Sequence, residues 1–242
     1  MRSHRFYIAE TIGDKIELEI HSLELIHQVR DVFRLKKGDS IIIFDGSGMD
    51  FTCRIEELGK NHLKLSVMES NKSRFMPTRD IYLCASVVKK DNFEFIVEKA
   101  TELGVTHIIP VMAERSEKKG LNEERLKKIA VEASEQSGRG NIPTIFPIMG
   151  LEECMNFCIG RTSAKLIAFH TEGEPFSGRL NLPDSSPIAI FIGPEGGWSP
   201  EEIKLFHKNN IPIVCLGKQV LRAETAVIAA LSLVMLGNEG FR

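Results

Sequence analysis

The sequence predicts an α/β protein in which a small β-rich domain precedes a larger domain built on a parallel sheet. Up to about residue 75, apolar and polar residues alternate in short runs, as in half-buried strands. From Asp80 onward, apolar strand-like runs alternate with amphipathic helices, which is typical of a parallel sheet covered by helices. Between Ile188 and Val234, two strand–loop–helix units follow one another directly. We therefore expect two domains, residues 1–72 and 73–242.

The composition is that of an ordinary globular protein, with 43% hydrophobic and 26% charged residues among 242. A net charge of −2 does not indicate a nucleic-acid binder, so any such binding would need local basic clusters. The longest apolar run, Ala226–Leu236, is too short to span a membrane, and the N-terminus lacks the apolar stretch of a signal peptide. We expect a cytoplasmic protein that contacts no membrane.

The five cysteines are scattered and include no C-x-x-C pair, which favours a reducing compartment. Cys154 and Cys158 could share one face of a helix, but no second pair has the spacing of metal ligands. We therefore expect no metal site.

In the first domain, four strands and one helix are expected, and they would pack as a small barrel. The strands lie at Lys15–Ile20, Ser40–Asp45, Asp50–Glu57 and His62–Val67, and the middle two form a hairpin across Gly46-Ser47-Gly48. The helix is expected over Ser22–Phe33, with an apolar face made of Leu25, Ile26, Val29, Val32 and Phe33.

After a polar linker at Ser70–Arg79, the second domain alternates strands and helices. Strands are expected at Ile81–Val88, Val105–Met112, Thr144–Met149, Ala164–Phe169, Ile188–Ile192 and Ile211–Leu216. Helices are expected at Asn92–Leu103, Asn122–Ser137, Leu151–Ile159, from Ser199 onward and at Glu224–Leu236.

Two glycine-containing loops stand out, and each follows one of the last two strands. The first reads Gly193-Pro194-Glu195-Gly196-Gly197-Trp198-Ser199 and runs into a capping box with proline at the first helical position. The second reads Leu216-Gly217-Lys218-Gln219-Val220-Leu221-Arg222-Ala223-Glu224-Thr225-Ala226. Both would lie at the carboxyl edge of the sheet, where open α/β sheets bind ligands. Neither has the spacing of a phosphate-binding loop or of a dinucleotide fingerprint.

These two loops resemble the signature loops of the RsmE family, which are SPOUT-superfamily methyltransferases. The family modifies N3 of a uridine in 16S ribosomal RNA. Further matches are Glu98-Lys99-Ala100-Thr101-Glu102-Leu103-Gly104-Val105, Glu135-Gln136-Ser137-Gly138-Arg139 and Phe44-Asp45-Gly46. Gln219 departs from the family pattern, in which arginine is common at this position.

The resemblance implies a methyl donor, S-adenosylmethionine, held by main-chain groups of three loops. The residues expected to bind it are Phe169, His170, Gly193, Glu195, Gly196, Gly197, Leu216, Gly217, Val220, Leu221, Thr225 and Ala226. We interpret His170 as lining the pocket and not as a base. Glu195 would orient the amino group of the donor or hold its own loop.

Two residues are candidates for chemistry. Uracil N3 must lose its proton before it attacks, and the guanidinium of Arg222 would stabilise the resulting anion. Its alternative role is to clamp a phosphate or carboxylate. Glu224 would accept the proton, and its alternative role is to interact with the dipole of the last helix.

The resemblance also implies a PUA-like RNA-binding domain at the N-terminus, a trefoil knot in the second domain and a homodimer. Basic residues expected to contact 16S ribosomal RNA in the small subunit are Arg2, Arg5, Arg34 and Lys36. The last helix is apolar nearly all round, so it must be buried in a core or against a second subunit.

Three other interpretations stay open. The protein could be a non-enzymatic RNA-binding module with a vestigial pocket, and donor binding without methyl transfer would favour that. It could be a dinucleotide-dependent oxidoreductase, against which the missing G-x-G-x-x-G argues. It could also be a methyltransferase for a different RNA base or atom.

Overall fold

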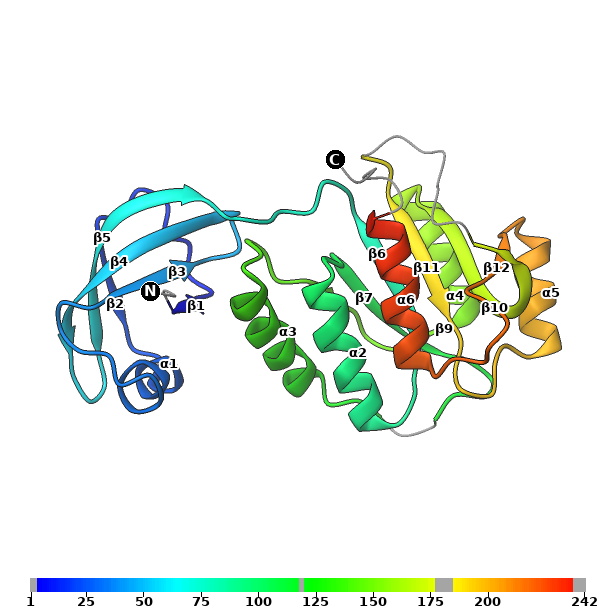
Figure 1. Cartoon of the computed structure of the whole chain (residues 1–242), viewed down its shortest axis with the longest axis horizontal. Helices are drawn as coiled ribbons and strands as arrows, with labels where there is room; N and C mark the ends of the chain where they lie inside the picture. The colour runs from blue at the N-terminus through cyan, green and yellow to red at the C-terminus, as the bar shows by residue number, and fades with distance from the viewer. Residues whose placement is uncertain (1–3, 118–119, 177–184, 237–242) are drawn as a thin grey trace. The chain divides into compact units, whose positions relative to one another are not determined.

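The computed structural model describes residues 4–117, 120–176 and 185–236, which form two compact units (Figure 1). The first unit contains the chain up to Met76 together with Ser134–Ile142, and the second contains the rest. The sequence places residues 134–142 in the second domain, whereas in the structure this segment belongs to the first unit. Two hydrogen bonds show why: Tyr7 N donates to Glu135 Oε1 at 2.8 Å, and Arg5 Nη1 donates to the carbonyl oxygen of Ser134 at 3.0 Å.

The first unit is organised around a five-stranded sheet in the order β1-β3-β4-β5-β2. Its strands are β1 (Arg5–Tyr7), β2 (Glu17–Ile20), β3 (Ser40–Phe44), β4 (Met49–Leu58) and β5 (Leu63–Lys72). β1 runs parallel to β3 and the other neighbours are antiparallel. The predicted hairpin is confirmed as β3–β4, whereas β1 was not predicted.

The predicted helix of the first unit is only partly correct. α1 (Leu23–His27) passes directly into a π-helical turn, η1 (Gln28–Val32). A π-helix has an i→i+5 hydrogen-bond pattern, so side chains beyond Gln28 depart from the 3.6-residue spacing. Val29 is still buried, but Val32 is 58% exposed and Phe33 40% exposed, so the predicted apolar face is too long.

The second unit is built on a parallel sheet in the order β12-β10-β11-β6-β7-β8, with β9 also paired to β7. All of its pairings are parallel, which confirms the predicted α/β class. The strands are β6 (Ile81–Ser86), β7 (His107–Met112), β8 (Thr144–Ile145), β9 (Met149–Gly150), β10 (Lys165–Pro175), β11 (Ile188–Ile192) and β12 (Ile213–Cys215). The trefoil knot stays a prediction of the family resemblance.

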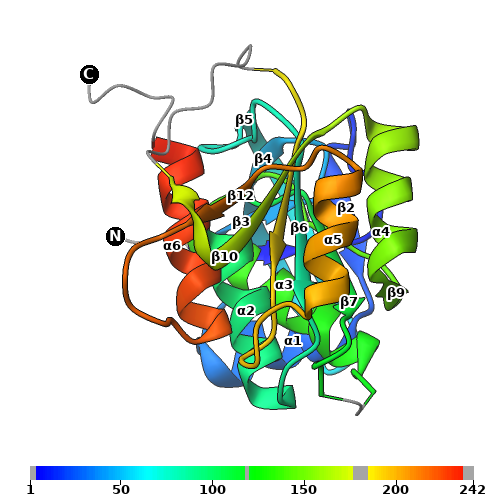
Figure 2. The ribbon, with the colours of Figure 1, turned by 90° about the vertical axis from the view of Figure 1, so that its right-hand side faces the viewer.

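Helices cover both faces of this sheet: α4 and α5 lie on one side of the strands, and α2 and α6 on the other (Figure 2). The helical segments are α2 (Lys90–Glu102), α3 (Glu123–Ser137), α4 (Leu151–Phe157), a π-helical turn η2 (Cys158–Thr162), α5 (Pro200–Lys208) and α6 (Ala223–Leu236). Because helices pack on both faces, every residue of β6 and β11 is buried.

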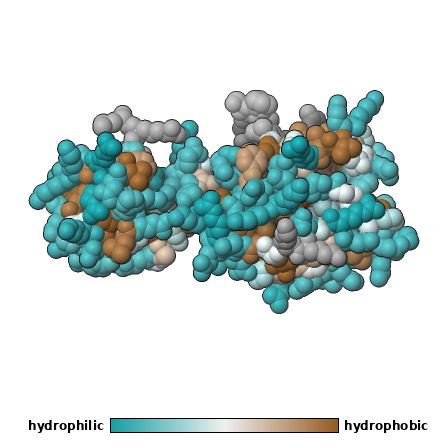
Figure 3. Space-filling view, turned by 90° about the horizontal axis from the view of Figure 1, so that it is seen from below, coloured by the Kyte–Doolittle hydropathy of each residue, from teal (hydrophilic) through white to brown (hydrophobic). Residues whose placement is uncertain are grey.

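The surface seen in Figure 3 is largely hydrophilic, with separate apolar areas. Among the described residues, every helix is too short or too polar to cross a bilayer.

β10 contains an irregularity that the sequence did not reveal. Val214 of β12 is paired first with Phe169 and again with Glu174, so residues 170–173 are extra on the β10 side. Gly173 allows this, because a Cβ there would lie only 2.5 Å from the backbone of Val214. The predicted strand ended at Phe169, whereas β10 continues to Pro175 and its extra segment contains His170.

Candidate functional site

A cavity of about 340 Å³ lies beside the irregular part of β10 and the carboxyl ends of β11 and β12. It is open to solvent and is formed by three segments: residues 169–172 within β10, the loop after β11 and the loop after β12. Its lining residues are Phe169, His170, Thr171, Glu172, Ile192, Gly193, Pro194, Glu195, Gly196, Gly197, Trp198, Leu216, Gly217, Gln219, Val220, Leu221, Ala223 and Ala226. Of the residues predicted to bind the donor, all but Thr225 are in this set. The carboxyl edge of the parallel sheet therefore carries a preformed pocket.

Trp198 joins two of the three segments that form the pocket. Its side chain is 2% exposed and packs edge-on against Phe206 of α5, with ring centroids 5.1 Å apart. Its Nε1 donates a hydrogen bond to the carbonyl oxygen of Phe169 at 3.0 Å. The loop after β11 is thus held to the end of β10 by a buried polar contact, which fixes the distance between two walls of the pocket.

The loop after β11 turns back through Gly197, whose φ is +68°. The N–H of Gly197 donates to the carbonyl oxygen of Pro194 at 2.8 Å, which closes the turn. Residues with a side chain rarely adopt this backbone conformation, so glycine is favoured here. The following helix α5 begins with the predicted capping box: Glu202 N donates to Ser199 Oγ, and Ser199 N donates to Glu202 Oε2.

A fourth segment, the one after β7, supports the pocket from outside. Arg115 Nη1 donates to the carbonyl oxygen of Gly196 at 2.7 Å. Next to it, Glu114 N donates to Glu202 Oε1 at 2.9 Å, so the same carboxylate that caps α5 also holds this segment. Arg115 is exposed and is not one of the residues that line the cavity.

His170 lies in the extra segment of β10. Its Nδ1 accepts a hydrogen bond from Glu172 N at 3.2 Å, so in the neutral ring the proton is on Nε2. A Cβ on Gly197 would lie 3.6 Å from that Nε2. The ring therefore faces the loop after β11, which is consistent with a residue that lines the pocket.

The two candidates for chemistry, Arg222 and Glu224, do not line the cavity. Both stand at the start of α6, next to the lining residues Leu221 and Ala223. The Arg222 side chain is exposed and makes no hydrogen bond or ion pair with any described residue. Glu224 Oε2 is buried and, within the described part of the chain, has no hydrogen-bond partner. Neither side chain is thus engaged by another described residue, and both stand next to residues that line the pocket.

The residues predicted to bind RNA differ in how they are used. Arg2 lies outside the described residues. Arg5 forms a two-point salt bridge with Asp50, at 2.6 and 3.2 Å, and its guanidinium stacks on Phe44 at 3.6 Å. The Arg5 side chain is only 8% exposed, so its guanidinium makes contacts inside the first unit. Arg34 and Lys36 are exposed, and Arg34 has a positive φ of 55° that turns the chain after η1.

Comparison with known families identifies the second unit. A family model described as an RNA methyltransferase domain matches residues 76–235. The chain belongs to the RNA methyltransferase family. A second model, described as the PUA domain of RNA methyltransferases, matches residues 29–68 of this methyltransferase.

Full-length relatives agree with this assignment. Ribosomal RNA small subunit methyltransferase E of Rickettsia conorii is 30% identical over 241 residues, which cover 98% of this chain and 96% of the relative. A solved structure of the protein of that name from Neisseria gonorrhoeae, bound to S-adenosyl methionine, has a TM-score of 0.87 at 28% identity and covers 97% of this chain and 98% of its own. A methyltransferase from Legionella pneumophila, in complex with the bound cofactor SAM, has a TM-score of 0.85 at 28% identity, with 98% of both chains covered.

Sequence reasoning missed several pocket residues of this methyltransferase. Trp198 and Pro194 lie inside a loop that was recognised, so their position in this loop could have predicted that they line the pocket. Arg115 is different, because it lies 81 positions before Gly196 in the chain and belongs to no motif that was recognised. Only the parallel neighbours β6 and β7 bring the segment after β7 to the same edge of the sheet.

Proposed function

We propose that this methyltransferase transfers the methyl group of S-adenosylmethionine to N3 of a uridine in the 16S RNA of the small ribosomal subunit, in the cytoplasm. The observation that supports this most is the preformed pocket at the carboxyl edge of the sheet, built from the two glycine-containing loops. Related proteins that are similar over nearly their whole length are named for the small-subunit RNA, and the structure of one of them holds this donor, as does that of the Legionella methyltransferase.

The pocket suits this donor because much of its wall is main chain. The loops after β11 and β12 contribute Gly193, Gly196, Gly197 and Gly217, which leave backbone N–H and C=O groups open to a ligand. Such groups can read the adenine and the ribose. Glu195 is exposed at the pocket and can accept hydrogen bonds from the donor's amino group.

Methyl transfer is a displacement in which the bond between sulfur and the methyl carbon breaks while a bond from N3 forms. The sulfonium becomes a neutral thioether, and the N3 proton must leave. Glu224 has a buried carboxylate oxygen, without a hydrogen-bond partner in the described parts of the chain, that can take this proton. The Arg222 side chain has no partner among the described residues and can stabilise negative charge on the uracil carbonyl oxygens. Orientation of donor and acceptor in the pocket lowers the barrier further.

RNA binding is assigned to the first unit, through the exposed Arg34 and Lys36. We also propose a homodimer that pairs the second units. α6 carries an almost uninterrupted apolar sequence, and its Leu233 is 37% exposed in the single chain. A second subunit would cover this side chain.

The deciding experiment is mass spectrometry of nucleosides from 16S RNA. Small subunits lacking the modification are incubated with the protein and with donor labelled in its methyl group. The expected product is labelled N3-methyluridine, formed by the wild-type chain and strongly reduced with Arg222→Ala. Label in a different nucleoside would replace the proposed target, and donor binding without any label in RNA would show a non-enzymatic protein.

A further inference from the structure

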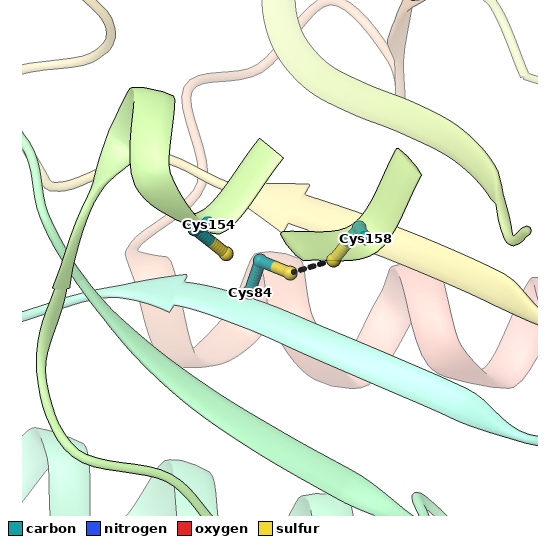
Figure 4. A group of neighbouring side chains, drawn as sticks. All are labelled: Cys84, Cys154 and Cys158. Carbon is teal, nitrogen blue, oxygen red and sulfur yellow. Dashed lines mark hydrogen bonds between the residues drawn. The ribbon is translucent and has the colours of Figure 1, made fainter. Parts of the chain in front are cut away.

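Three cysteines meet in the core of the second unit (Figure 4), and none of them lines the donor pocket. Cys84 lies on β6, Cys154 on α4, and Cys158 is the first residue of η2. All three side chains are 0% exposed. Their sulfur atoms lie within 4.8 Å of one another, and Cys84 Sγ and Cys158 Sγ are 3.8 Å apart. Among the described residues, this is the group of three His, Cys, Asp or Glu whose ligand atoms converge.

The separations are those of sulfur atoms around one central atom. Thiolates bound to tetrahedral zinc at about 2.3 Å lie about 3.8 Å from each other. Only small movements of the three side chains would therefore bring the sulfur atoms to the separations found around one bound thiophilic atom. The backbone is also unusual here, because the α-helix becomes a π-helical turn at Cys158, and such turns occur often at functional sites.

The surroundings limit the charge that the site can hold. The thiols belong to an apolar core cluster that includes Val111, Met155, Ala189 and Phe191. The histidine whose charge acts on Cys158 is His107, and burial lowers the pKa of its imidazole. Three thiolates around Zn²⁺ would leave one net negative charge in this core, and around Cu⁺ they would leave two. Burying an uncompensated charge in an apolar core is strongly unfavourable. Three thiolates around a trivalent centre are neutral, so a trivalent thiophilic centre fits best.

We propose that Cys84, Cys154 and Cys158 form a binding site for trivalent arsenic, entering as arsenous acid. Three S–H bonds and three As–O bonds break, while three As–S bonds form and three water molecules leave. No atom changes its oxidation state, so no oxidant or reductant is required. Arsenous acid is uncharged at neutral pH, which allows it to enter an apolar core during local opening of α4 and η2. The site is independent of methyl transfer.

The test uses the full-length protein, reduced with a phosphine, incubated with arsenite and then desalted. Native mass spectrometry is expected to show one arsenic atom gained and three hydrogen atoms lost. X-ray absorption at the arsenic edge is expected to show three sulfur neighbours and no oxygen. Because the three thiols converge only in the folded chain, arsenite should bind the folded state more tightly than the unfolded state and raise the melting temperature.

The matched control is Cys53→Ala, which removes a buried free cysteine from the first unit. This variant should bind arsenic as the wild type does, whereas Cys84→Ala, Cys154→Ala and Cys158→Ala should each lose the three-sulfur site and the rise in melting temperature. Circular dichroism of each variant before arsenite addition reports whether it is folded. Wild-type protein that emerges without arsenic, or a folded Cys158→Ala variant that retains it equally well, would overturn the proposal. Zinc retained as firmly as arsenic would overturn the argument from charge.

Discussion

Trp198 donates its indole N–H to the carbonyl oxygen of Phe169 at 3.0 Å, although the two residues lie 29 positions apart in the chain. The contact is buried and joins the loop after β11 to the end of β10. Trp198→Phe keeps an aromatic ring against Phe206 and leaves the Phe169 carbonyl without its donor. We expect a loss of about 1 to 3 kcal/mol in the free energy of unfolding, measured by urea denaturation. Donor affinity should fall as well, since both residues line the pocket. Unchanged stability together with unchanged affinity would mean that the contact does not hold the pocket.

Arg115 supports the pocket loop through the Gly196 carbonyl. Arg115→Ala should weaken donor binding several-fold, measured by calorimetry, because one charge-assisted hydrogen bond at an exposed position contributes about 1 kcal/mol. The matched control is Arg125→Ala, which removes another exposed arginine of the second unit, paired with Glu94. Equal donor affinity in both variants would refute the supporting role of Arg115.

Replacing Arg222 tests whether this residue acts in the chemical step or only in RNA binding. If its guanidinium stabilises charge on the uracil ring, Arg222→Ala should lower the single-turnover rate at saturating RNA by a factor that corresponds to about 3 kcal/mol. Donor affinity should change little. Arg222→Lys should restore only part of the rate, because lysine keeps the charge and loses the planar fork. A near-normal rate in the alanine variant, together with weaker RNA binding, would instead identify a phosphate clamp.

The first unit is predicted to carry the RNA contacts. Replacing Arg34 and Lys36 by alanine should weaken binding to the small subunit and leave donor affinity alone. Each lost phosphate contact should reduce the dependence of the logarithm of the binding constant on that of the salt concentration by about 1. Lys15→Ala serves as the control, since Lys15 is paired with Glu10 in the same unit. A salt dependence identical to that of the wild type would argue against these contacts.

Assembly is predicted to depend on α6. Leu233→Asp introduces a charge on the exposed part of this apolar helix and should convert the dimer into a monomer with reduced methylation. Sedimentation velocity measures the first effect and the nucleoside assay the second. Ile159→Asp, at a position that is 46% exposed on η2, is the control and should remain dimeric. A Leu233→Asp variant that stays dimeric and active would contradict the proposed interface.

The sequence was sufficient for most of the second unit because its signals are local. The strand Ile188–Ile192 is apolar throughout, and the Ser199 capping box marks the start of α5 within one residue. Reliance on local signals also explains why the predicted apolar face of the first-unit helix was too long. Val32 and Phe33 fit a 3.6-residue spacing, but a π-helical turn that starts at Gln28 changes the direction in which the following side chains point. No residue pattern in the sequence indicated this turn.

Parts of the site depend on contacts that are distant in the chain, and these could not be read from spacing. Cys154 and Cys158 were visible as a pair, whereas Cys84 joins them only because β6 lies beneath α4 and η2. Likewise, the extra segment of β10 exists because Gly173 can approach the backbone of Val214, and neither residue carries a local signal for that pairing.

The return of residues 134–142 to the first unit has a consequence for synthesis on the ribosome. The N-terminal strands emerge first, but Arg5 and Tyr7 lack their partners Ser134 and Glu135 until almost sixty further residues beyond Met76 have been translated. β6, α2 and β7 precede these partners in the chain and are therefore synthesised before the first unit can be completed. Neither unit can be cut out as one continuous piece of the gene.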